Sequence, residues 1–72
     1  MDIRRLFGAN VRRYRLAAEL SQEAVAELMG VDRAYVSSIE RGRQNVTLLT
    51  ILQTSQALGV TPADLLHANP AK

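Results

Sequence analysis

The sequence predicts an all-α fold, a compact domain of five short helices. Apolar residues recur at helical spacing, as in the stripe formed by Phe7, Val11, Tyr14 and Ala18. No segment alternates between apolar and polar residues over a useful length, so strands are not expected. Most of the periodic segments lie between a residue that caps helices well and a glycine, which gives each expected helix a beginning and an end.

The first two helices are bounded by residues that favour helix ends. The first helix is expected from its N-cap Asp2 to about Ala18. The second begins after the N-cap Ser21 and stops at Gly30, because glycine readily takes the left-handed conformation that ends a helix. The side chains that the second helix turns inward are expected to be Val25, Ala26 and Met29.

The next two helices follow the same rule. The third is expected between its N-cap Asp32 and Gly42, and the fourth between its N-cap Thr47 and Gly59. The expected core positions are Val36 and Ile39 in the third helix and Leu48, Ile51, Leu52, Ser55 and Leu58 in the fourth.

The last helix has a well-marked start. Thr61, Pro62 and Asp64 stand as the N-cap, the first helical residue and the third helical residue, positions that suit each of them. A short fifth helix is therefore expected to run to about His67. Residues 1–67 then form one domain, and residues 68–72 a flexible C-terminal tail.

The composition limits what this domain can do. A chain of 72 residues has little stability to spare, so a partner subunit is the expected support. The lack of cysteine and the single histidine argue against a metal site and fit the cytoplasm. No phosphate-binding loop or catalytic grouping is present, so neither an enzyme nor a cofactor is expected. Without a long apolar run or a second domain, neither a membrane nor a small-molecule effector is an expected partner.

The basic residues have a pattern that permits nucleic-acid binding. Eight of the nine are arginines, and all eight stand at or before Arg43. The planar guanidinium suits phosphates and guanine edges better than the ammonium of lysine does. Arg4, Arg5, Arg12 and Arg13 fit either a solvated face or a weak electrostatic contribution to DNA binding, and both interpretations stay open.

The most specific signal is the motif QEAVAELMGVDRAYVSSIER at residues 22–41. Two helices here meet through a turn of about three residues that contains a glycine, the spacing of a helix-turn-helix. Ala26 is small enough for the second helix to approach the third, and Gly30 supplies a left-handed turn. The apolar joint that sets the angle between the helices is expected to consist of Val25, Met29, Val31, Val36 and Ile39.

From Leu20 to Val60 the chain resembles the phage-repressor-like (Xre/Cro type) helix-turn-helix family. The resemblance rests on LSQEAVA at 20–26, SSIERG at 37–42 and ALGV at 57–60. It implies a lambda-repressor-like domain that regulates transcription by binding double-stranded DNA as a homodimer, on a roughly palindromic operator. The tract at 32–48 is also similar to controller proteins of restriction–modification systems. Glu19 departs from the family, which often has glycine there, and is expected to tighten or displace the first loop.

The resemblance also assigns roles to individual positions. In this class the second helix of the motif meets base edges in the major groove, and phosphate contacts on either side hold its register. The expected base contacts are Arg33, Ala34, Tyr35, Ser37 and Ser38, and the expected phosphate contacts are Gln22, Arg43, Gln44 and Asn45. By the same resemblance, Arg15 and Glu40 are expected to form a structural ion pair that joins the first and third helices.

Several alternatives stay open. One of the two serines could instead bond to its own helix, and Asn45 could instead cap the fourth helix. Repression and activation both fit a regulator of this size, and an antitoxin-type interaction module that also binds its own promoter is the alternative function. The expected dimer interface is an apolar patch formed by Val46, Leu49 and Leu66.

Overall fold

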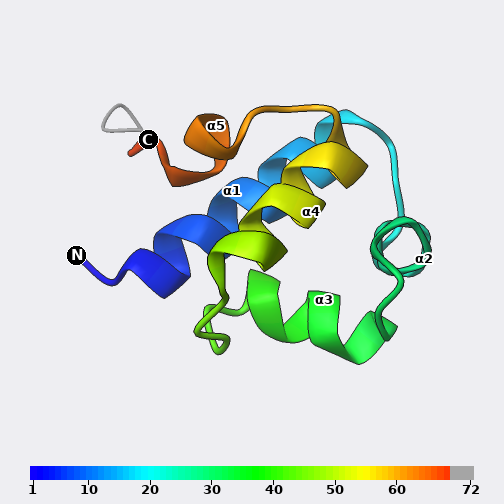
Figure 1. Ribbon diagram of the computed structural model, residues 1–72, viewed down its shortest axis with the longest axis horizontal. Coiled ribbons are helices and arrows are strands. Elements are labelled where there is room, and N and C mark those ends of the chain that lie inside the picture. The colour runs from blue at the N-terminus through cyan, green and yellow to red at the C-terminus, as the bar shows by residue number, and fades with distance from the viewer. Residues whose placement is uncertain (69–72) are drawn as a thin grey trace.

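The computed structural model describes residues 1–68, and within them the chain forms five helices and no strand (Figure 1). The helices are α1 (Ile3–Ala17), α2 (Gln22–Met29), α3 (Arg33–Glu40), α4 (Leu48–Leu58) and α5 (Pro62–Leu66). The all-α, five-helix prediction is therefore confirmed. The expected tail lies outside the described residues, apart from Ala68. None of the five helices is both long and apolar enough to cross a membrane.

The helix beginnings follow the predicted caps. The side chains of Asp2, Ser21 and Thr47 each accept a hydrogen bond from a backbone N–H in the first turn of their helix. Thr61 goes further, because it forms a capping box with Asp64 at the start of α5. The start of α3 differs, because its N-cap residue Asp32 makes no capping hydrogen bond with its side chain.

The core fills the space between α1 and the other four helices. Its fully buried apolar side chains are Phe7, Val11, Val25, Ala26, Met29, Val36, Ile39, Leu58 and Leu65. The expected inward positions of α2 and α3 are all among them. Ala18 is not: it follows the end of α1 and is exposed, because the chain has already turned toward α2.

The predicted core face of α4 is partly wrong. Ser55 and Leu58 are buried as expected and Ile51 is half-buried, but Leu48 is 86% exposed and Leu52 is 42% exposed. Thr54, which was not expected in the core, is buried. The buried hydroxyls are satisfied within the helix, since Thr54 donates to the carbonyl oxygen of Thr50 at 2.7 Å and Ser55 to that of Leu52 at 2.7 Å. The helix is therefore rotated so that its hydroxyl-bearing face meets the core and several leucines face outward.

Glu19 ends α1 in a left-handed conformation, with φ 58°. It is the one residue other than glycine with a positive φ in the described part of the chain. A side chain at this conformation costs about 1–2 kcal/mol because its Cβ crowds the following carbonyl oxygen. The departure from the family's glycine thus adds strain to the first loop without removing the turn.

Candidate nucleic-acid interface

The pair formed by α2 and α3 has the geometry of the predicted motif. Gly30 ends α2 with φ 74°, and the next amide, of Val31, donates to the carbonyl oxygen of Ala26 at 3.0 Å. This pattern closes α2 and starts α3 only three residues later. In Figure 1, α3 runs along the lower edge of the molecule with α2 seen end-on beside it. One side of α3 is consequently free of the other helices.

The expected base-contacting residues lie differently on α3. Arg33 and Ala34 are exposed, and Ser37 is partly exposed one turn further along the helix. Tyr35 is half-buried on the flank of α3, where it lines a hollow between the α2–α3 turn and α4. The hydroxyl of Ser38 donates to the carbonyl oxygen of Tyr35 at 2.7 Å, so it bonds to its own helix. The outward face of α3 is thus formed mainly by Arg33, Ala34 and Ser37.

The expected phosphate-contacting residues lie near the C-terminal end of α3, at the start of α2 and in the loop that follows α3. Gln22 opens α2, and its amide nitrogen donates to Glu40 Oε1 at 3.1 Å. Arg43 and Asn45 are exposed in the loop between α3 and α4, and Gln44 is half-buried there. The alternative role of Asn45 as a helix cap is wrong, because Thr47 caps α4.

An ion pair between Arg15 and Glu40 fixes α3 to α1. Arg15 Nε lies 2.6 Å from Glu40 Oε2 and Nη2 lies 3.1 Å from Oε1, while Nη1 donates to the carbonyl oxygen of Leu20 at 2.9 Å. The two side chains are only 10% and 3% exposed. The bond to Glu40 raises the pKa of the Arg15 guanidinium above its ordinary value. Because Gln22 shares the same carboxylate, the network joins α1, α2 and α3.

Two residues that the sequence reasoning missed also position α3 and α5. A Cβ atom at Gly8 would collide with the carbonyl oxygen of Ile39 and lie 3.0 Å from that of Glu40, so only glycine allows α1 to approach α3 this closely. A glycine inside a helical pattern was the available signal. The side-chain amide of Asn10, on α1, donates to the carbonyl oxygens of Leu65 at 2.8 Å and His67 at 3.0 Å. No local sequence pattern indicates this link between α1 and α5.

The proposed interface patch is partly exposed. Leu49 is 62% exposed and Leu66 is also exposed, whereas Val46 packs half-buried against the core. Val46 and Leu66 line a small pocket of about 90 Å³ together with residues of α1 and α4. The leucines of α4 that were wrongly assigned to the core, Leu48 and Leu52, add to the apolar surface beside Leu49.

Comparison with known proteins identifies this arrangement. Residues 11–65 match the family model described as helix-turn-helix. The control protein C.BamHI of Bacillus amyloliquefaciens is 50% identical over 90% of this chain and 82% of its own length. The crystal structure of the hypothetical transcription factor NHTF from Neisseria superimposes with a TM-score of 0.91 at 38% identity, over 97% of this chain and 80% of that chain.

A second similar structure contains DNA. It is the restriction–modification controller protein C.Esp1396I, a tetramer in complex with its natural 35 base-pair operator. It superimposes with a TM-score of 0.82 at 25% identity, over 90% of this chain and 86% of that chain. With the family model, the relatives and the geometry of α2 and α3 in agreement, the chain belongs to the helix-turn-helix family, in its phage-repressor-like (Xre) type.

Proposed function

We propose that this protein is a transcription regulator that binds a roughly palindromic operator as a homodimer and inserts α3 in the major groove. The observation that carries the proposal is the outward face of α3, which is free of other helices and held rigidly by the pair of Arg15 and Glu40. A recognition helix must be held in this way, because base edges are read by side chains at fixed positions. A DNA-bound function also fits the cytoplasm.

Each residue of the exposed face suits a different base contact. Arg33, at the start of α3, has the length and the planar fork for a bidentate contact with guanine, worth about 1–3 kcal/mol of discrimination. Ala34 can touch the methyl group of thymine. Ser37 follows one turn later on the same face, where its short hydroxyl can bond to a base edge. Tyr35 and Ser38 have weaker support as base contacts, because the first lies on the flank and the second bonds to its own helix.

Phosphate contacts on both sides of the groove complete the binding surface. Gln22 stands at the N-terminus of α2, where backbone N–H groups favour a phosphate. Arg43 and Asn45 are exposed in the loop after α3, and Gln44 lies between them. Contacts of this kind fix the register of the protein but read no sequence.

A homodimer would place two copies of α3 in successive major grooves, about 34 Å apart. Support comes from the similar C.Esp1396I structure, which is an oligomer on operator DNA, and from the apolar surface around Leu49. Leu49→Glu is expected to give a monomer in sedimentation and to weaken DNA binding. Leu28→Glu is the matched control, because Leu28 is equally exposed, at 62%, but belongs to α2. An unchanged dimer mass in Leu49→Glu would remove this interface.

The central test is selection from a randomised duplex pool followed by binding titrations at several salt concentrations. Wild type should enrich a two-fold-symmetric sequence. Arg33→Ala should lose preference at one base pair in each half-site, whereas Arg43→Ala should weaken binding to all sequences and reduce the salt dependence. Weak binding without sequence preference and with a steep salt dependence would show that the protein contacts only phosphates. That result would contradict the proposal.

A narrower function is favoured by the names of the similar proteins. C.BamHI is called a control protein and C.Esp1396I a restriction–modification controller. We propose that this chain regulates a restriction–modification system in the same way. The prediction is that the operator selected in the pool occurs upstream of endonuclease and methyltransferase genes in its own genome, and occurrence elsewhere alone would contradict it.

A further inference from the structure

The exposed arginines of α1 fall into two classes, and the first class is bound within the helix. Arg4 donates to the carboxylate of Asp2 through Nε and Nη2, both at 3.3 Å. Arg13 donates to Asn10 Oδ1 at 3.2 Å, and its guanidinium lies 4.6 Å from the centroid of the Tyr14 ring. These two side chains already have partners in the folded protein.

The second class consists of Arg5 and Arg12, whose side chains have no hydrogen-bond or ion-pair partner within residues 1–68. They are seven residues apart and therefore lie on one face of α1. This face meets the end of α3: a Cβ atom at Gly42 would lie 2.8 Å from Cγ of Arg5, and Gly8, between the two arginines, abuts the carbonyl oxygen of Glu40. Arg5 and Arg12 consequently flank the C-terminal end of the proposed recognition helix.

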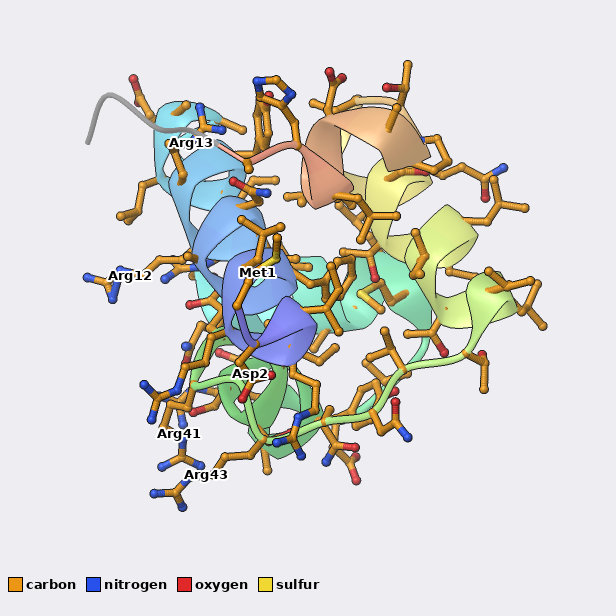
Figure 2. All side chains as sticks on the ribbon, turned by 90° about the vertical axis from the view of Figure 1, so that its left-hand side faces the viewer. Met1, Asp2, Arg12, Arg13, Arg41 and Arg43 are labelled. Atoms are coloured by element: carbon orange, nitrogen blue, oxygen red, sulfur yellow. The ribbon has the colours of Figure 1, made fainter. Side chains whose placement is uncertain are left out.

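The positive charge continues from α1 to α3. Figure 2 shows Arg12, Arg41 and Arg43 projecting from the same side of the molecule, with Arg13 at its top. Arg41 is seven residues after Ala34 and so continues the outward face of α3. The one acidic residue of α3, Glu40, already bonds to Arg15 and Gln22, so it leaves this charge uncompensated.

We propose that a basic strip formed by Arg5, Arg12 and Arg41, which continues from Arg43, binds the phosphate backbone of DNA that flanks each half-site. The inference rests on the proposed function, because a half-site must first be seated on α3. Guanidinium groups pair with phosphate oxygens in a bidentate geometry, and a strip that continues from the recognition helix guides the duplex along α1 beyond the bases that are read. The strip then adds affinity without adding base recognition.

The experiment compares two duplexes and two charge-matched variants. One duplex ends at the selected operator, and the other carries about ten additional base pairs of arbitrary sequence on each side, roughly one helical turn. The test variant is Arg5→Gln/Arg12→Gln. The control is Arg4→Gln/Arg13→Gln, which removes the same charge from the same helix but from side chains with partners in the fold. Melting by circular dichroism establishes that both variants are folded.

Wild type and the control are expected to bind the extended duplex more tightly than the short one. The test variant should lose this preference and keep its affinity for the short duplex. On the extended duplex, the slope of log K against log salt concentration should become shallower by about 0.9 for each phosphate contact that the variant loses.

Three results would overturn the inference. Wild type could bind both duplexes equally, which leaves the proposed function intact but removes the flanking contact. Both variants could weaken equally, which would show an effect of net charge alone. The test variant could weaken on the short duplex too, which would place its arginines inside the half-site. Failure of the proposed function is distinct, because wild type would then prefer no selected duplex at all.

Discussion

Replacement of Arg15 by methionine tests how the recognition helix is held. The Glu40 carboxylate accepts three hydrogen bonds, two from Arg15 and one from Gln22, and its side chain is only 3% exposed. Arg15→Met keeps most of the side-chain volume but leaves the carboxylate buried with a single neutral donor. A buried charge that loses its partner in this way costs about 3–5 kcal/mol.

This cost is large for such a small domain. At about 0.05–0.15 kcal/mol per residue, a chain of 72 residues has a free energy of unfolding of roughly 4–11 kcal/mol. Arg15→Met should therefore remove a large part of it. The double variant Arg15→Met/Glu40→Leu should be more stable than Arg15→Met, because the unpaired charge is gone and an apolar pair takes its place. Gln22 is half-exposed and can bond to water instead.

Urea unfolding followed by far-ultraviolet circular dichroism measures these differences. The protomer concentration must be the same for all variants, because dimerisation adds to the apparent stability. The midpoint for Arg15→Met should fall by at least about 1 M. A loss below about 1 kcal/mol, as for a solvent-exposed pair, would refute the reasoning. So would a double variant that is no more stable than Arg15→Met, since the cost would then not come from the unpaired carboxylate.

Three further predictions follow from single positions. Gly8→Ala should lower the free energy of unfolding by about 1–3 kcal/mol because the new methyl group meets the carbonyl oxygen of Ile39, and a higher melting temperature would contradict this. Glu19→Gly should raise stability by about 1 kcal/mol, or the melting temperature by about 4–8 °C, because it relieves the left-handed strain; no gain would show that the loop is not strained. Hydrogen bonds from Thr61 lower the pKa of Asp64 below 3.8, so its contribution to stability is full above that value and is lost as the pH falls through the lowered pKa. Titration of Asp64 by NMR checks this, and a value at or above 3.8 would contradict it.

The helices were predictable because helix ends depend on nearby residues. Ser21, Thr47 and Thr61 cap helices through bonds to amides three residues away, and Gly30 and Gly59 end helices through their own conformation. All of these signals act within about one helical turn. For the same reason the helix-turn-helix motif, whose spacing is local, could be recognised from the sequence.

The orientation of α4 shows where local patterns stop being sufficient. This helix carries more apolar residues than one face can hold, and the sequence does not rank its faces. In the folded chain Thr54 faces the core, where its hydroxyl is satisfied by a bond back to the helix, whereas Leu48 and Leu52 are exposed. The apolar surface proposed for dimerisation depends on this choice.

The five helices, most of their caps and the residues of the helix-turn-helix motif follow from the sequence alone, because they depend on spacing and on bonds between near neighbours. Which distant side chains become partners depends on how the helices pack. Asn10 bonds to the carbonyl oxygen of Leu65 from 55 positions away, Gly8 meets the end of α3, and Arg5 and Arg12 differ from their neighbours in having no partner within residues 1–68. These differences arise where segments distant in the sequence pack together. The pattern of residues along one helix does not show which residues of another helix will lie against it.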